Sequence, residues 1–326
     1  MGPPLVLLPP ECSPLGPPGS RHILSRKQQK FELLATSLHR SLPPSLAKRV
    51  DGLISRAKAR VIWATGQRFR LGPLEQGALS VLLSYLQDSA NPWATHLGHI
   101  VPRRPNIYSQ GDASLEAGGA HCPTLEFWFD VTWSPWVHRG AHHTRPTSPG
   151  YVHINSLEYI VVLLQHAAVA TRLATATPGQ LSRWFPQGTP AIPYWMCDCD
   201  NMVSTHWDRT LSARGLAGQN LLTVGSELHR RFPLRAESRH LEGKKNVVAD
   251  DISRNDFSLP FPLRFAQLCA KHPSLGSWDY FLPSPELLQL LCSRLFSGPV
   301  QAPCALPTVL GRFLPAGSTI SNSPVI

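Results

Sequence analysis

The chain has 326 residues, of which 42% are hydrophobic and 7 are cysteines. This length and apolar content allow at least one full hydrophobic core and exclude a chain that is disordered throughout. Lysine and arginine number 31 against 21 aspartates and glutamates, and this net charge of +10 favours a polyanionic partner such as nucleic acid, because basic surface attracts phosphate. The odd number of cysteines, spread along the chain, argues against a disulfide framework and predicts reduced thiols.

The same features predict an intracellular protein, in the cytoplasm or nucleus, without a membrane partner. No run of about 18 apolar residues indicates a membrane span. Prolines interrupt the apolar opening of the chain, which lacks the charged start and continuous core of a secretory signal. The 32 prolines gather at both ends and in loops, so we expect a disordered, proline-rich segment over 1–30 and an ordered core between the two ends.

The first predicted elements are helices. Apolar residues recur at helical spacing from Ser45 to about Arg68, with basic residues largely elsewhere around the helix, and a second apolar run extends roughly from Pro73 to Gln87. We therefore expect a helical segment over 31–100.

Three strands are predicted next, within NIYSQGDAS, after a Gly-Gly turn, and within TLEFWFDVTW, because these stretches are rich in aromatic and β-branched residues and joined by short turns. The following stretch, SPWVHRGAHHTRPTSPGY, carries four histidines when His153 just beyond it is included. We interpret it as a solvated basic loop, because its histidines show no recognisable metal-ligand spacing.

The remaining elements alternate between helix and strand. A helix from Ile154, a buried strand AIPYWMCDC, a helix DNMVSTHWDR, a helix over about Gly218–Phe232, a strand RAESRHL and a helix VVADDIS follow in turn. By the usual connection rules this order predicts an α/β fold, with a mixed five-stranded sheet flanked by helices. Short helical pieces among prolines predict a linker or tail over 256–326.

The segment from His240 to Arg254, HLEGKKNVVADDISR, is the most specific motif in the chain. Gly243 permits a sharp turn after a strand, and Asn246 is a suitable N-cap for the helix that follows. Asp250 falls in the first turns of that helix. From the residues alone, Asp250 either complements the helix dipole or has a chemical role.

This segment resembles the end of the ribonuclease H domain in retroelement polyproteins of the gypsy and DIRS types, where His, Gly, Asn, Ala-Asp and Ser-Arg close the catalytic domain. In that family the Asp is a metal ligand and the His lies beside the scissile phosphate, which implies these roles for Asp250 and His240. The resemblance covers about 105–255 and implies a ribonuclease H-like fold there. The helical segment before it and the proline-rich tail after it match such polyproteins more loosely.

Three further acids stand where the resemblance requires them. Asp112 ends the first strand, Glu158 lies in the first helix of this region, and Asp200 follows the buried strand. Each also has a local structural explanation: a turn for Asp112, a capping box with Asn155 for Glu158, and a helix cap for Asp200. Asp198, two residues earlier on the same face of the strand, is the rival of Asp200.

The resemblance implies that Asp112, Glu158, Asp200 and Asp250 hold two Mg²⁺ ions, with Mn²⁺ as the alternative ion. Two divalent cations about 4 Å apart support phosphodiester hydrolysis, and hard cations take oxygen ligands. His240 would assist proton transfer or product release. The expected substrate contacts, whose alternative is ordinary solvated surface, are Asn201, Arg209, Arg214, Lys244 and Lys245.

The sequence therefore predicts a magnesium-dependent ribonuclease H, part of a retrotransposon polyprotein, that cleaves the RNA strand of RNA/DNA hybrids. The chain carries no Tyr-x-Asp-Asp motif of a polymerase, so the remainder of such a polyprotein is an expected partner. The alternative is a catalytically inactive remnant that still binds nucleic acid. Zinc binding by Cys197, Cys199 and His206 is disfavoured, because the thiols are not spaced as C-x-x-C and no second pair follows.

Overall fold

The computed structural model describes residues 104–318, apart from 144, 147, 149, 211, 212, 214, 233, 299–303 and 317. The disordered segment predicted over 1–30 and the helical segment predicted over 31–100 lie outside the described residues, as does Arg214.

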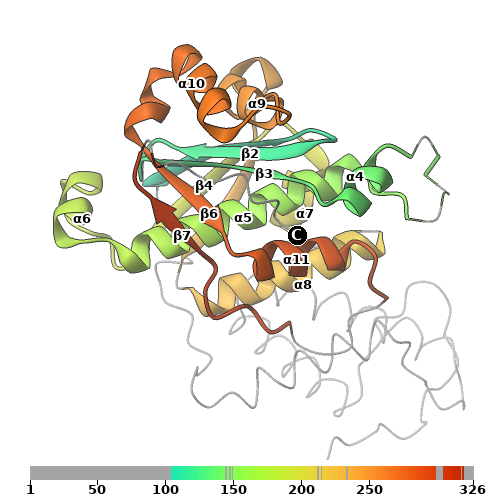
Figure 1. The fold of residues 1–326 in the computed structure, drawn as a ribbon. Helices are drawn as coiled ribbons and strands as arrows, with labels where there is room; N and C mark the ends of the chain where they lie inside the picture. The colour runs from blue at the N-terminus through green and yellow to red at the C-terminus, as the bar shows by residue number, and fades with distance from the viewer. Residues whose placement is uncertain are drawn as a thin grey trace, which may run out of the picture. The chain divides into compact units, whose positions relative to one another are not determined.

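Seven strands form one mixed sheet in the order β5-β4-β1-β2-β3-β6-β7 (Figure 1). Their bounds are β1 (Ile107–Ala113), β2 (Ala117–Cys122), β3 (Phe127–Thr132), β4 (Tyr194–Cys199), β5 (Arg235–His240), β6 (Asp279–Pro283) and β7 (Gly311–Leu314). The β1–β4, β4–β5 and β3–β6 pairs are parallel, whereas the β1–β2, β2–β3 and β6–β7 pairs are antiparallel. The predicted α/β class is confirmed.

Eight α-helices accompany the sheet within the described residues. They are α4 (Pro135–Ala141), α5 (Ile154–Thr175), α6 (Pro178–Trp184), α7 (Met202–Thr210), α8 (Leu216–Arg231), α9 (Val247–Ser253), α10 (Phe261–Lys271) and α11 (Pro285–Arg294), with 3₁₀ turns η2 (Gly243–Lys245) and η3 (Pro273–Ser277). Helices α5 and α8 cover one face of the sheet, and α9 and α10 cover the other (Figure 1). The predicted solvated loop after β3 is thus wrong in part, because it contains α4.

Helix α5 is the central element of the larger core. Almost all of its residues are buried, from Ser156 to Ala170, and the inner side chains of β1 to β4 pack around it. Among the described residues it is also the one helix long and apolar enough to cross a membrane, by length and composition. Two β2 glycines allow the close packing on both faces: a Cβ at Gly118 would lie 2.5 Å from Val161 of α5, and one at Gly119 would lie 2.4 Å from Ile252 of α9.

A smaller core on the opposite face is completed by residues after Arg254. Trp128 of β3 stacks on Phe261 of α10, with ring centroids 6.1 Å apart, and Tyr280 of β6 packs edge-on against the same indole. Strand β6 pairs with β3, and β7 then pairs with β6. The prediction of a five-stranded sheet is therefore wrong in its strand count, because residues predicted to form a tail extend the sheet by two strands.

Candidate acidic site at the sheet edge

Two of the predicted acids lie at the same edge of the sheet. Strands β1 and β4 are parallel, with Gly111 opposite Cys199. Asp112 and Asp200 each come one residue later along the chain, so the register brings them side by side at the carboxyl ends of the two strands. This edge is where open α/β sheets usually carry their sites.

Glu158 reaches the same edge from α5. Its carboxylate accepts a hydrogen bond from the Cys199 thiol, with 3.6 Å between sulfur and oxygen. One carboxylate oxygen of Glu158, one of Asp200 and the Cys199 sulfur all lie within 4.8 Å of one another. A helix and a strand that are far apart in sequence thus bring two carboxylates together.

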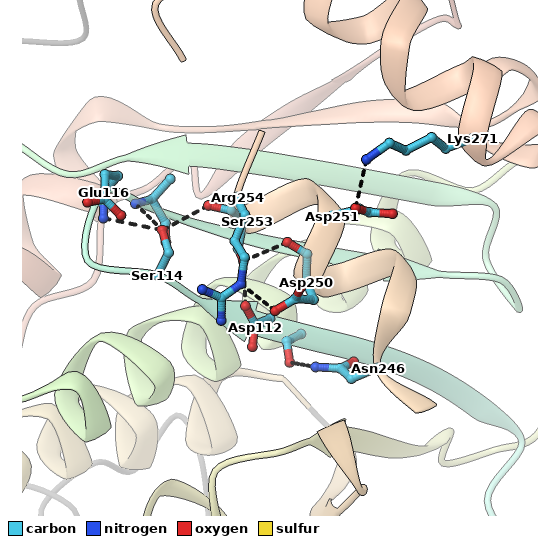
Figure 2. A network of polar contacts seen from close by, with 11 residues as sticks. Asp112, Ser114, Glu116, Asn246, Asp250, Asp251, Ser253, Arg254 and Lys271 are labelled. Atoms are coloured by element: carbon cyan, nitrogen blue, oxygen red, sulfur yellow. Dashed lines mark hydrogen bonds and ion pairs between the residues drawn. The ribbon is translucent and has the colours of Figure 1, made fainter. Parts of the chain in front are cut away.

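Asp112 is buried and faces the end of α9. Its carboxylate accepts a hydrogen bond from the Ser253 hydroxyl, and Asp250, one turn earlier on α9, forms an ion pair with Arg254 (Figure 2). Ser114, and not Asp112, stabilises the β1–β2 turn: its Oγ accepts hydrogen bonds from the backbone amides of Glu116 and Ala117. Asp112 is therefore not used as a turn residue.

Asn246 ties α9 to the central strand. It stands at the N-cap position, but its side chain forms no cap; its Nδ2 donates to the carbonyl oxygen of Gly111, 3.0 Å away. The predicted capping role is therefore wrong. The amide holds the start of α9 against β1, one residue before Asp112, and so positions Asp250 near the sheet edge.

Burial and the charges of neighbouring acids raise the pKa values of Asp112, Glu158 and Asp200. Burial, followed by the charges of Asp112 and Asp200, raises the pKa of Glu158 to about 9. Burial also raises the pKa of Asp112 to about 6, although the Ser253 hydrogen bond partly offsets it. The pKa of Asp200 is raised by burial and by Asp250. The carboxylates therefore form one electrostatically coupled group in which added positive charge is stabilising.

Neither Glu158 nor Asp200 caps a helix, although the sequence position of each allowed that role. Helix α5 is capped by His153, whose Nδ1 accepts from the Asn155 amide at 3.1 Å, and no capping box involves Glu158. Helix α7 is capped by Asn201, whose Oδ1 accepts from two amides of the first turn at 3.0 Å each. Both acids are left available for another role.

Asp198 and Asp200 occupy different environments. Asp198 is buried and accepts two hydrogen bonds of 2.8 Å from the guanidinium of Arg239, its register partner on β5. Asp200 lies beyond the strand, near Glu158. The bidentate pair satisfies Asp198 within the sheet, so the geometry favours Asp200 as the third acid.

His240 ends β5, opposite Cys199, and is exposed to solvent. Its charge lowers the pKa of Asp200, against the larger effect of burial. The turn that follows approaches the same acid, because a Cβ on Gly243 would lie 3.3 Å from the Asp200 carboxylate. His240 therefore borders the acidic group without being buried in it.

The expected substrate contacts differ in their exposure to solvent and in their local contacts. Lys244 and Lys245 are exposed on η2, where Lys245 lies 3.3 Å from Glu242. Arg209 is exposed in the last turn of α7. Asn201 is engaged locally, since its Nδ2 donates to Asn155 at 3.0 Å in addition to its cap. The position of Arg214 is not described.

Three residues at the site were not predicted to act there: Cys199, Ser253 and Arg254. Ser253 and Arg254 follow Asp250 by three and four residues, the spacing that places side chains on one face of a helix. That spacing is visible in the sequence and was a usable signal. The contact between Cys199 and Glu158 has no such signal, because it depends on how α5 packs on β4.

Zinc binding by Cys197, Cys199 and His206 finds no support in the described residues. Cys197 and Cys199 are buried, whereas His206 is exposed on α7. Within the described ranges, no cluster of potential metal ligands contains Cys197 or His206.

No family model, curated protein or solved structure matches this chain.

Proposed function

We propose that this protein is a ribonuclease H-like nuclease that cleaves the RNA strand of RNA/DNA hybrids with Mg²⁺, or with Mn²⁺ as the alternative ion. The observation that carries the proposal is the gathering of Asp112, Glu158, Asp200 and Asp250 at one sheet edge. Each comes from a different part of the fold: β1, α5, the end of β4 and α9. The same four acids are those implied by the resemblance to retroelement polyproteins.

The strand arrangement supports a ribonuclease H-like fold for this part of the chain. Strands β1 to β5 are adjacent in the order β5-β4-β1-β2-β3, with β2 antiparallel to both of its neighbours. Helices α4, α5 and α6 lie between β3 and β4, α7 and α8 lie between β4 and β5, and α9 follows β5. Apart from α4 and α6, this is the order of elements predicted from the sequence, and β6 and β7 extend the sheet beyond β3.

The donor set fits hard divalent cations. Four carboxylates supply oxygen ligands, which Mg²⁺ prefers, and two of them already lie within 4.8 Å of each other. Burial raises the pKa values of Asp112 and Glu158 because it disfavours their charged forms, so a bound cation would stabilise both groups as carboxylates. When bound, divalent ions would supply an activated water and neutralise charge on the phosphate.

The surrounding side chains would hold and assist this group. Ser253 orients the Asp112 carboxylate through its hydrogen bond, and Asn246 fixes α9 against β1. The guanidinium of Arg254 pairs with Asp250. The Arg254 side chain is 61% exposed, so its remaining N–H groups are accessible to a phosphate oxygen. His240 stands at the solvent side, where it would assist proton transfer or product release.

The test compares cleavage of a labelled RNA/DNA hybrid by the full chain with Mg²⁺ and with a chelator. We expect Asp200→Asn and Asp250→Asn to lower Mg²⁺-dependent cleavage by about 100-fold or more, because several kcal/mol of charge stabilisation are lost. Asp198→Asn and Asp251→Asn are matched controls that retain activity, since Asp198 pairs with Arg239 and Asp251 with Lys271. Circular dichroism checks that each variant is folded.

Two outcomes would count against the proposal. Full Mg²⁺-dependent cleavage by both Asp200→Asn and Asp250→Asn would exclude this acidic site as the active site. Binding of the hybrid that weakens with salt, without any cleavage by the wild-type chain, would support the alternative of an inactive nucleic-acid-binding remnant.

A further inference from the structure

A second group of potential metal ligands lies between α4 and the β1–β2 turn. His138 is on α4, His142 is its C-cap residue, and Glu116 precedes β2. The two imidazole rings are 4.4 Å apart between centroids, and His142 Nε2 lies 3.3 Å from Glu116 Oε1. One ligand atom from each of the three residues lies within 4.8 Å of the others.

The fold, not a linear motif, creates this group. His138 and His142 are four residues apart, so the helical conformation of α4 places both rings on one face. In an extended strand the same two residues would be about 13 Å apart, too far to share one ion. The β1–β2 turn then brings Glu116 to that face from more than 20 positions earlier in the chain. Its backbone amide donates to Ser114 Oγ at 3.2 Å, which helps to fix the turn.

The donor set differs from that of the acidic site. Two imidazole nitrogens and one carboxylate suit transition metals such as Zn²⁺, whereas Mg²⁺ prefers oxygen ligands alone. Around a zinc ion the ligand atoms would be about 3.3 Å apart, given Zn–N and Zn–O distances of about 2.0–2.2 Å. The side chains of His142 and Glu116 are 43% and 56% exposed, so they are free to make the small movement required.

A simple ion pair explains only part of this arrangement. The 3.3 Å contact between Glu116 and His142 accounts for two of the three side chains, and it does not account for the neighbouring His138 ring. A divalent cation instead accepts the neutral nitrogen of each ring together with the carboxylate. Three protein ligands leave one coordination position for water, as in open zinc sites.

We propose that Glu116, His138 and His142 form a binding site for a divalent transition metal ion of the Zn²⁺ type. The site is distinct from the acidic site in residues and in ligand chemistry, and it does not depend on nuclease activity. A bound ion would link α4 to the turn between β1 and β2. The same turn carries Ser114, whose Oγ donates to the carbonyl oxygen of Ser253 at 2.8 Å (Figure 2).

The experiment measures Zn²⁺ binding to the full chain, purified without a polyhistidine tag and with Mg²⁺ in excess. Calorimetry gives affinity and stoichiometry, and the visible absorption of Co²⁺ in place of Zn²⁺ reports nitrogen ligands. We expect His138→Gln and His142→Gln each to weaken one binding site by tenfold or more, with Glu116→Gln weakening the same site. His143→Gln, which alters an exposed neighbouring histidine, is the matched control and leaves binding unchanged.

The outcomes separate this site from the others in the chain. Unchanged affinity and stoichiometry in a His138→Gln, His142→Gln double variant would overturn the proposal. Loss of the same Zn²⁺ site in Asp200→Asn, with the double variant unaffected, would assign the ion to the acidic site and also overturn it. Because the variants alter exposed side chains, circular dichroism is expected to show an unchanged fold. Hybrid cleavage is a separate measurement, so failure of either proposal leaves the other standing.

Discussion

Asp198 and Asp200 are two residues apart but have different surroundings: Asp198 pairs with Arg239 within the sheet, whereas Asp200 lies at the acidic site. Alternation along β4 places them toward the same face, so the pattern of the strand alone does not separate them. The register with β5 does, because it sets Arg239 directly opposite Asp198. Pairing partners on another strand are invisible in a local sequence pattern, and this is why the choice between the two acids required the fold.

The other candidate acids follow the same reasoning. Glu158 has the spacing of a capping box, and Asp200 has the position of a helix cap, yet His153 and Asn201 perform those roles. Local propensity was a poor guide at these positions, because several neighbouring residues were able to satisfy the same backbone amides. The positions of the acids along the chain were predictable, whereas their contacts with Cys199 and Ser253 were not.

His121 provides a test of electrostatics away from the acidic site. It is buried on β2, with its Nε2 3.1 Å from Gln110 Oε1 and its ring stacked on Trp278. Burial, followed by the charge of His272, lowers the pKa of His121 to about 4, against an ordinary value of 6.5. The fold therefore favours the neutral ring. Above pH 6.5 the neutral ring costs the folded state nothing. As the pH falls from 6.5 toward 4, the unfolded chain binds a proton at His121 that the folded chain does not, so the free energy of unfolding decreases.

We expect His121→Gln to show this dependence. The free energy of unfolding of the wild type, relative to that of the variant, should fall by about 2 kcal/mol between pH 7 and pH 4.5, because only the wild type binds a proton here on unfolding. Urea unfolding of both proteins at the two pH values measures the change, and other titrating groups cancel in the difference. A difference that stays constant with pH would contradict the buried, neutral assignment.

At the scale of elements, an ion pair joins α10 to β3. Asp130 is buried on β3, Arg264 of α10 pairs with it, and the Tyr280 hydroxyl donates to its carboxylate at 2.6 Å. Burial raises the pKa of Asp130, and Arg264 is the leading opposing influence. Removing the arginine would leave a buried carboxylate without its cation, which costs more than the pair itself contributes.

Arg264→Met is therefore expected to lower the free energy of unfolding by about 3–5 kcal/mol, and Asp130→Asn in the same chain should recover much of that loss. Arg183→Met is the matched control. Arg183 pairs with Glu126 but its side chain is 59% exposed, so its loss should cost less than about 1 kcal/mol. Urea unfolding at pH 7 measures all variants. Equal costs for Arg264→Met and Arg183→Met would show that the Asp130 pair is not effectively buried.

Helix α4 shows how one element was misassigned. Pro135 follows Ser134 and occupies the first turn of the helix, which is a common helix start. The sequence instead predicted a solvated loop here, because its histidines show no recognisable metal-ligand spacing. The proposed zinc site depends on this helix, because the helical conformation brings His138 and His142 together although they are four residues apart.

At the scale of the whole molecule, the order of elements from β1 to α9 was largely predictable, because periodic apolar patterns and turn residues mark each of them. The additions after Arg254 were not. Strands β6 and β7 are short and flanked by proline, as in a linker, and they are strands only because the edge at β3 accepts β6. Their conformation depends on a distant partner more than on local propensity.

A truncation tests whether this last part of the chain is a separable tail. Residues after Arg254 supply Phe261, Leu268, Leu275 and Tyr280 to the smaller core, and their removal would uncover Trp128. At about 1.5–3 kcal/mol for each buried side chain, the loss is roughly 6–12 kcal/mol, similar to the whole stability of an ordinary domain. A chain ending at Asp256 should therefore fail to unfold cooperatively.

The matched control is a chain ending at Ser318, which retains every described element and should keep the melting temperature of the full chain. Thermal melts followed by near-ultraviolet circular dichroism compare the two truncations. If the chain ending at Asp256 melted as cooperatively as the control, the residues after Arg254 would be an independent appendage. Loss of cooperative melting in that chain alone would instead make α10 and β6 part of the same folding unit that carries the acidic site, because Trp128 and Asp130 of β3 would have lost their cover.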